Sequence, residues 1–203
     1  CLFLTEASIN LADDPELMRL LVKAGFISVF IGVETPDEES LKTCNKKQNT
    51  KRDLIEDIHE IQRSGLQVMA GFIVGFDSDS PSIFNRMIEF IQRSGIVTAM
   101  VGLLQAPNKT ELYRKLDEQG RIIKEMTGDN TDGTTNIIPI MDPTQLKEGY
   151  FKIMDQIYSP KMFYQRIKTF LREYQPAKSS VTIEPNEVFA LLKTIFLMGF
   201  NPR

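Results

Sequence analysis

Dense apolar runs recur through the first half of the chain, at residues 26–33, 66–74 and 96–104. Each run follows a segment with helical periodicity that ends in a glycine, at Gly25, Gly65 or Gly95. A glycine just past the last helical turn adopts the left-handed conformation that closes a helix. Apolar, partly β-branched runs of this length are typical of strands buried on both faces. The pattern therefore predicts repeating strand–helix units.

Helix start signals complete this pattern. Asp14 precedes a proline, and Thr35 stands three residues before Glu38, which is the spacing of a capping box. With a first strand at the N-terminus, the predicted order is β-α-β-α-α-β-α-β-α, and its strands should be parallel. A segment of a (β/α) barrel and an open doubly wound sheet both fit, while the lack of GxGxxG after a strand disfavours a dinucleotide-binding fold. The predicted helix caps are Asp14, Thr35, Thr50 and Ser80.

The second half of the chain has a different pattern. Residues 127–135 form a polar, turn-rich loop, and three helical patterns follow at 144–158, 160–174 and 186–198. We interpret a stripe of apolar residues in the second of these patterns as contacts with the core. The stripe consists of Phe163, Ile167, Phe170 and Tyr174. We therefore expect an α/β part over residues 1–125 and a helical part over residues 126–203.

Composition narrows the class of protein. A formal net charge of −3 and a pI near 5.4 disfavour a nucleic-acid partner, because no basic excess exists to neutralise phosphates. No apolar run reaches the ~18 residues that span a bilayer, so no membrane association is expected. The two cysteines, Cys1 and Cys44, form no disulfide framework and indicate a reducing cytoplasm. Because both ends of the chain, Cys1 and Arg203, adjoin apolar elements, we expect them to lie within a longer polypeptide.

The strand ends carry the candidate site, because ligands of parallel α/β folds bind at the carboxyl ends of the strands. Glu34 and Asp79 also fit a simpler interpretation, in which they are acids favoured at helix starts. Gly71 and Gly75 either mark a tight strand approach or give a ligand access to the backbone. The polar candidates at the strand ends are Glu6, Glu34, Asp79 and Gln105.

Other chemistries have less support. His59 is the only histidine and lies in the middle of a predicted helix, where we expect a surface position. A Ser-His-Asp triad, a zinc site and a metal-dependent lyase site on another barrel are therefore disfavoured. Cys44 lies in a basic loop, and we interpret it as incidental.

Segments at the strand ends resemble a known family. GVET at 32–35, GFIVGFDSDS at 71–80 and QAPNKTELY at 105–113 resemble the later strands of the radical S-adenosylmethionine (radical SAM) barrel. NTDGTTNIIPIM at 130–141 and the segment 149–174 resemble the C-terminal helical extension of members that also carry a cobalamin-binding domain. The resemblance covers nearly the whole chain. It implies that residues 1–125 are the C-terminal half of a TIM-like (β/α) barrel and residues 126–203 the helical extension.

The resemblance also implies cofactor-binding residues. Glu6 and Glu34 stand where the family has carboxylates that hold the amino-acid or ribose part of S-adenosylmethionine (SAM). The backbone of Gly71, Ile73 and Gly75 would approach adenine. The residues expected beside the adenosyl group are Gln105, Ala106 and Pro107.

The activity that the resemblance implies belongs to a longer protein. Members of the family cleave SAM reductively to a 5′-deoxyadenosyl radical, which abstracts a hydrogen atom from a small-molecule substrate. Their [4Fe–4S] cluster is held by a CxxxCxxC loop that precedes these strands. Because Cys1 and Cys44 cannot replace that loop, we expect this chain alone to be inactive and to require the N-terminal half barrel of the same polypeptide. Cobalamin-dependent methyl transfer is one expected outcome in the intact protein.

A second interpretation stays open. The chain would then be a non-catalytic binding or interaction module on an α/β scaffold, and the strand-end acids would only cap helices. In either case half a barrel leaves strand edges unpaired, so we expect self-association into a homo-oligomer.

Overall fold

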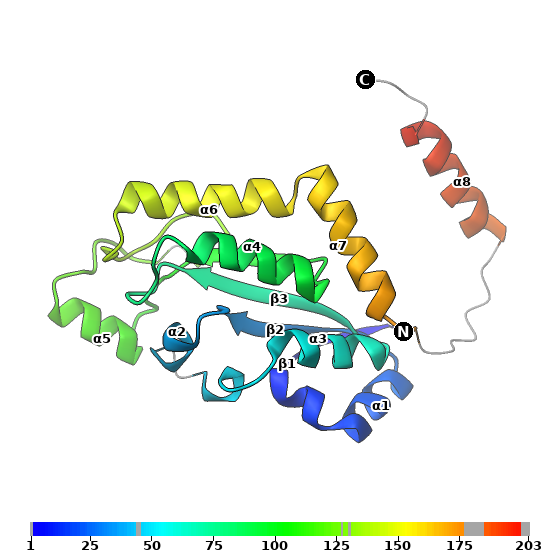
Figure 1. Cartoon of the computed structure of the whole chain (residues 1–203), viewed down its shortest axis with the longest axis horizontal. Coiled ribbons are helices and arrows are strands. Elements are labelled where there is room, and N and C mark those ends of the chain that lie inside the picture. Colours follow the sequence, from blue (N-terminus) through cyan, green and yellow to red (C-terminus); the bar gives the residue numbers. More distant parts are fainter. Residues whose placement is uncertain (1, 44–45, 127, 130, 177–184, 200–203) are drawn as a thin grey trace.

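Four parallel strands form the centre of the molecule. The computed structural model describes residues 2–43, 46–126, 128–129, 131–176 and 185–199. Each strand pairs with its neighbour in sequence, as in a barrel segment, so the predicted α/β class and parallel pairing are confirmed. In sheet order the strands are β1 (Phe3–Ala7), β2 (Phe26–Glu34), β3 (Gln67–Val74) and β4 (Ala99–Leu103) (Figure 1).

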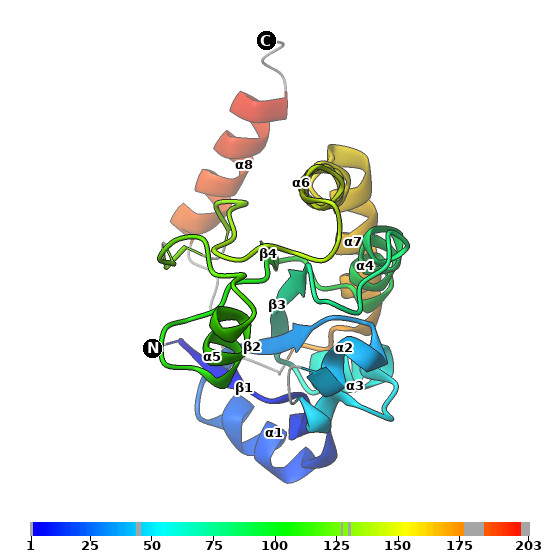
Figure 2. The same cartoon turned by 90° about the vertical axis from the view of Figure 1, so that its left-hand side faces the viewer.

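Helices cover one face of this sheet. The helices between successive strands are α1 (Pro15–Lys23), α2 (Glu38–Thr43), α3 (Leu54–Arg63) and α4 (Ile83–Ser94). Figure 2 shows α3 and α4 on one side of the sheet and α5 (Glu111–Glu118) on the other. Val29, Ile31 and Val33 of β2 are completely buried in the main hydrophobic cluster, which therefore lies between the sheet and its helices.

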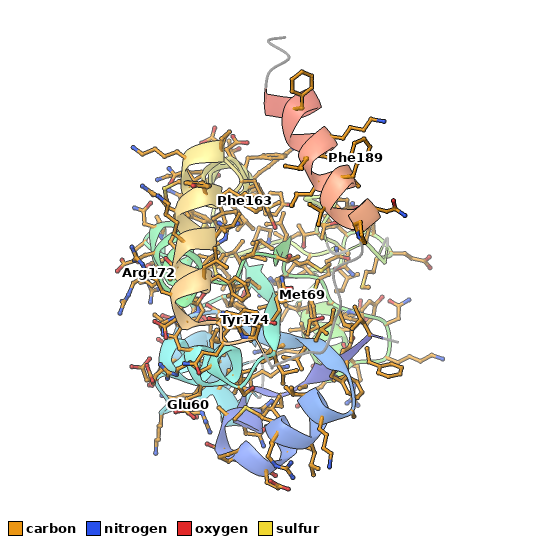
Figure 3. The ribbon with its side chains drawn as sticks, turned by 90° about the vertical axis from the view of Figure 1, so that its right-hand side faces the viewer. Glu60, Met69, Phe163, Arg172, Tyr174 and Phe189 are labelled. Carbon is orange, nitrogen blue, oxygen red and sulfur yellow. The ribbon has the colours of Figure 1, made fainter. Side chains whose placement is uncertain are left out.

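The opposite face of the sheet is only partly covered. Its residues alternate with the buried ones along β2 and β3, and most of them are half-buried. The prediction of strands buried on both faces is therefore wrong for the described residues, in which no second layer covers this whole face. Figure 3 shows Met69 on the side of β3 away from α7 (Pro160–Glu173). We call this side the open face; it includes Glu6, Phe30, Gly32, Glu34, Met69, Gly71 and Ile73.

Two helix starts test the capping predictions. The Asp14 carboxylate accepts a hydrogen bond of 2.9 Å from the N–H of Leu17, which confirms this cap. Helix α3 starts later than predicted, at Leu54, because the Asp53 carboxylate rather than Thr50 accepts from two backbone N–H groups, each at 3.2 Å. A carboxylate wins over a nearby hydroxyl here because its charge strengthens hydrogen bonds to the free N–H groups of a first turn.

The other two predicted caps are also displaced. Asp37, not Thr35, caps α2 by accepting a hydrogen bond of 3.0 Å from the N–H of Ser40. Thr35 is fully buried, and its hydroxyl accepts a hydrogen bond from the N–H of Asp37. Helix α4 begins at Ile83, after the predicted cap Ser80. The helices exist where the sequence predicts them, and their first residues shift by a few positions.

The helical extension packs onto the α/β part. Helices α6 (Pro143–Ile157) and α7 lie against α4, and α8 (Pro185–Gly199) stands apart from them in Figure 1, so all three predicted helical patterns are confirmed. Four residues of α6 belong to the same hydrophobic cluster as the strands: Leu146, Tyr150, Ile153 and Ile157. The core thus continues past residue 125, and the division of the chain there stays a prediction. No described helix is long and apolar enough to cross a membrane.

Candidate functional site

The carboxyl ends of the four strands lie along one edge of the sheet, because all four are parallel. Glu34 is the last residue of β2, and Gly75 and Gln105 closely follow β3 and β4. Glu6 is exposed and level with Phe30, so it lies further from this edge than Glu34. The topology therefore brings the predicted residues to the half of the sheet that includes its carboxyl edge, and Glu6 lies furthest from that edge.

Glu34 is not a helix cap. Its φ is 68°, and the pairing of β2 with β3 shifts between Gly32 and Glu34. A left-handed conformation at a residue other than glycine is strained, and such strain is common at functional sites. Here it lets the carboxylate fold back over the open face, where Oε1 lies 2.8 Å from Nζ of Lys46. The side chains of Glu34 and Lys46 keep 15% and 33% of their surface exposed, so a ligand can reach both charges.

Gly32 makes room for this ion pair. A Cβ atom on Gly32 would lie 2.7 Å from Oε1 of Glu34 and 3.0 Å from Nζ of Lys46. No real Cβ approaches a carboxylate oxygen so closely, so a larger residue at this position would displace both charged groups. The absence of a side chain at Gly32 therefore leaves the space on the open face that the ion pair occupies.

Asn49 fastens the loop that carries Lys46. Its side-chain N–H groups donate to the carbonyl oxygens of Gly32 and Val33, both at 3.1 Å, and the residue is 2% exposed. Lys46 and Asn49 were not predicted as members of the site, and Gly32 was named only as part of the GVET segment, without a role. The available signal was the basic segment around Cys44, which was considered only for its cysteine, and Cys44 itself lies outside the described residues.

Gly71 of β3 and Gly75, directly after this strand, both face protein atoms. A Cβ on Gly71 would lie 3.2 Å from the ring of Phe30, on the open face. Gly75 has a φ of 102°, and a Cβ there would lie 3.1 Å from Leu146 of α6. Gly75 is therefore needed for its backbone conformation and for the approach of the extension. Ile73, between them, packs with the small cluster that α5 contributes to at the strand ends.

Asp79 holds Gly75 in place. Its Oδ2 accepts hydrogen bonds from the N–H of Gly75 at 2.8 Å and of Phe76 at 3.1 Å, and its Oδ1 accepts one from the hydroxyl of Ser40 at 3.1 Å. Burial raises the pKa of the Asp79 carboxyl above its ordinary value, and these hydrogen bonds oppose that shift. Asp79 therefore holds the backbone of its own loop after β3 and joins that loop to α2.

The predicted residues after β4 contact the extension. The side-chain amide of Gln105 donates to the carbonyl of Asp129 at 2.9 Å and of Thr134 at 3.3 Å. Ala106 is completely buried, and Pro107 is exposed. Segment 105–107 therefore lies between the sheet edge and the loop that precedes α6.

Two expectations concern metals and histidine. Among the described residues, no group of three or more histidine, cysteine or acidic side chains is placed to hold a metal ion. Cys1 also lies outside those residues, so the structure does not test it as a ligand. His59 is less exposed than predicted, because its side chain packs beside the carbonyl of Arg93, with a nitrogen–oxygen distance of 3.2 Å.

Comparisons with known proteins agree with this arrangement. Residues 4–91 match the radical SAM superfamily, and residues 110–203 match a domain of unknown function, DUF4070. An uncharacterized methyltransferase of Synechocystis sp. is 38% identical over 92% of this chain. Hopanoid C-2 methylase of Rhodopseudomonas palustris is 31% identical over 87% of it.

A more distant relative is bacteriochlorophyllide d C-8(2)-methyltransferase of Chlorobaculum tepidum, which is 22% identical over 82% of this chain. The chain spans 35%, 32% and 34% of the lengths of these three relatives, about a third of each. The parallel strands with their candidate site lie mostly within the first matched segment. Through residues 4–91, the chain belongs to the radical SAM superfamily.

Proposed function

We propose that this chain is the C-terminal part of a radical SAM methyltransferase. The observation that carries the proposal is the Glu34–Lys46 ion pair, accessible on the open face at the carboxyl ends of parallel strands. The family match and the methyltransferase relatives support it, since the names of all three relatives describe methyl transfer. The rival function, a non-catalytic binding module, has no comparable observation in its favour.

The open face fits the amino-acid part of SAM. That part carries an ammonium and a carboxylate on one carbon, and Glu34 and Lys46 present the two complementary charges side by side. On binding, each exchanges its partner in the ion pair for the opposite charge of the ligand, so no charge is left unpaired. Gly32 leaves the space that this exchange needs. Gly71 and Ile73 lie on the same open face, Gln105 lies at the carboxyl edge, and all three would contact the adenosyl part.

The remaining cofactors have no ligands in the described residues. No group of three or more histidine, cysteine or acidic side chains there is placed to hold a metal ion. We propose that the cluster, and cobalamin where it is used, are held by other parts of a longer polypeptide. One SAM molecule, cleaved with an electron from such a cluster, would supply the hydrogen-atom abstraction, and a second SAM molecule would supply the methyl group. This chain's own residues bind and orient SAM, and the extension shields the end of β4 from water.

The substrate is proposed as a small molecule methylated at carbon. The names of two relatives specify a carbon position on a hopanoid and on a bacteriochlorophyllide. A small molecule that accepts a methyl group at a carbon atom is therefore the substrate class that we infer for this chain.

Replacing Glu34 by glutamine in the complete polypeptide is expected to weaken SAM binding at least tenfold, about 1.4 kcal/mol. The amide keeps the shape of the side chain but removes the charge that pairs with the ammonium. Lys46→Met should have a similar effect through the carboxylate. Calorimetric titration of SAM into the cluster-reconstituted protein measures both.

Glu38→Gln is the matched control, because Glu38 is an exposed acid only a few residues away, in the first turn of α2. It should bind SAM like the unchanged protein. If Glu34→Gln and Lys46→Met also bind normally and lose only thermal stability, the ion pair is structural and the assignment fails.

A further inference from the structure

Asn136, in the extension, makes a two-way contact with the backbone at the end of β4. Its Oδ1 accepts a hydrogen bond of 2.8 Å from the N–H of Ala106, and its Nδ2 donates one of 2.8 Å to the carbonyl of Ala106. Asn136 is 1% exposed, and Ala106 is completely buried. Ala106 lies beyond the end of β4, where no neighbouring strand among the described residues pairs with it. The Asn136 side-chain amide satisfies both backbone polar groups of Ala106, as a neighbouring strand would.

Neighbours of Asn136 extend this contact along the same segment. The hydroxyl of Thr135 donates to the carbonyl of Leu104 at 2.5 Å. The side chain of Gln105 reaches back to carbonyl groups of the extension loop. Every residue from Leu104 to Ala106 is therefore hydrogen-bonded to a residue among 129 and 131–136. We call this loop segment the strap.

The strap itself is fixed to the body of the protein. The carbonyl of Asn136 accepts a hydrogen bond of 3.0 Å from the N–H of Ile123. The hydroxyl of Tyr150, on α6, donates to the carbonyl of Thr131 at 2.9 Å. Gly133 lies against the ring of Tyr150, where an added Cβ would be 2.9 Å from the ring. The strap is thus held from both sides and can transmit a defined position to segment 104–106.

A second set of contacts is made by Arg121, which precedes the strap in the sequence. The guanidinium of Arg121 pairs with both carboxylate oxygens of Asp77, at 2.8 Å and 2.6 Å, and donates to the carbonyl of Ile138 at 2.8 Å. Asp77 belongs to the loop after β3, next to Gly75. Arg121, which lies within the segment 110–203 that matches DUF4070, therefore links the loop after β3 to Ile138 of the extension, while the strap contacts the segment after β4.

We propose that Asn136 is a positioning residue for the cofactor and that holding the edge segment 104–107 is a function of the DUF4070 extension. This inference rests on the proposed function, because it places the adenosyl part of SAM against that segment. Asn136 does not touch the cofactor. It fixes the position of the Ala106 backbone. Through that backbone it also fixes the neighbouring residues Gln105 and Pro107 where they would contact the ligand.

A contact at the other end of β4 provides the comparison. The hydroxyl of Tyr158, also in the extension, donates to the carbonyl of Ala99 at 2.7 Å. This bond likewise ties the extension to β4, but at the amino end of the strand, away from the site. Losing the Tyr158 hydroxyl should therefore affect stability without affecting the cofactor.

The test compares Asn136→Ala with Tyr158→Phe in the complete polypeptide with its cluster reconstituted. Asn136→Ala should raise the KM for SAM about tenfold while kcat changes little, and should speed hydrogen exchange of the Ala106 amide. Tyr158→Phe should lower the melting temperature but leave KM and the Ala106 amide unchanged. Should Asn136→Ala fail to fold, Thr135→Val should show the same KM effect on a smaller scale, because it removes the bond of the Thr135 hydroxyl to the Leu104 carbonyl together with the weaker bond that this hydroxyl accepts from the N–H of Ile137.

Two results are informative in different ways. If the unchanged protein binds no SAM, the proposed function fails. If the unchanged protein binds SAM, and Asn136→Ala exposes the Ala106 amide while KM stays the same, the proposed function stands and the positioning role is overturned. Equal KM changes in Asn136→Ala and Tyr158→Phe would also overturn it, because the effect would then follow stability alone.

Discussion

Replacing Arg166 by alanine is expected to lower the free energy of unfolding by about 3–5 kcal/mol, because several buried acceptors each lose a partner worth about 1–3 kcal/mol. Arg166 on α7 is completely buried. Its guanidinium donates to Gln92 at 2.8 Å and to the carbonyl groups of Ile157 at 2.7 Å and Val97 at 3.1 Å. It thereby joins α7 to α4, α6 and the segment before β4. Urea denaturation of the 203-residue chain measures the change.

Two controls separate this network from charge alone. Arg172→Ala removes an exposed arginine on the same helix, which points away from the body in Figure 3, and should change stability by no more than about 0.5 kcal/mol. Arg166→Lys keeps the positive charge but lacks the planar fork that reaches several acceptors, so most of the loss should remain. An Arg166→Lys variant as stable as the unchanged chain would show that the charge, not the network, matters. Burial already lowers the pKa of the Arg166 guanidinium, which argues against that outcome.

Gly149→Ala is expected to destabilise the chain by about 2 kcal/mol or more through overpacking, although alanine favours helices by about 1 kcal/mol over glycine. Gly149 is buried in α6, where a Cβ atom would overlap the ring of Phe84 on α4. One methyl group should therefore push apart the two helices that join the extension to the α/β part. Thermal or urea unfolding of the 203-residue chain measures the effect.

Phe84→Leu provides the rescue for this substitution, because a smaller side chain opposite position 149 makes room for the methyl group. The double variant should lose less stability than the sum of the two single variants, and a double-mutant cycle measures the difference. Strict additivity would contradict the close contact between Gly149 and Phe84.

Much of the fold follows from short-range signals. The glycines after helices predict strand–helix units correctly, and Gly95 adopts the left-handed conformation with a φ of 69°. The strands, their parallel pairing and the helices of the extension are all confirmed. Burial on both strand faces was wrong, because an apolar run by itself does not reveal which layers exist to cover it.

Residues whose role depends on distant backbone groups escaped prediction. The stripe on α7 selected apolar side chains, and Phe163 and Phe170 are indeed half-buried, but the fully buried residue of that helix is Arg166. Its acceptors lie in other elements, so local periodicity cannot indicate them. Position at a strand end was enough to select Glu34. Its partner Lys46 comes from a loop that folds back onto the sheet, and no spacing rule predicts that contact.

Asn136 escaped prediction for the same reason. It lies in a polar loop of turn-forming residues, where asparagine ordinarily serves the local turn. Its actual partner, Ala106, is far away in sequence, and only the packed structure brings them together. The cofactor roles of the predicted residues remain predictions, including that of Gly75, whose N–H is already engaged by Asp79.

The structure of the complete polypeptide with SAM bound is the most direct test of the assignment of this site. We expect the amino-acid part of SAM on the open face, with its ammonium at hydrogen-bonding distance, about 2.7–3.2 Å, from the Glu34 carboxylate and its carboxylate beside Lys46. The adenosyl part should lie along the segment that Asn136 holds. SAM bound on the helix-covered face, or on the open face with the Glu34–Lys46 pair unbroken and out of contact, would contradict the assignment.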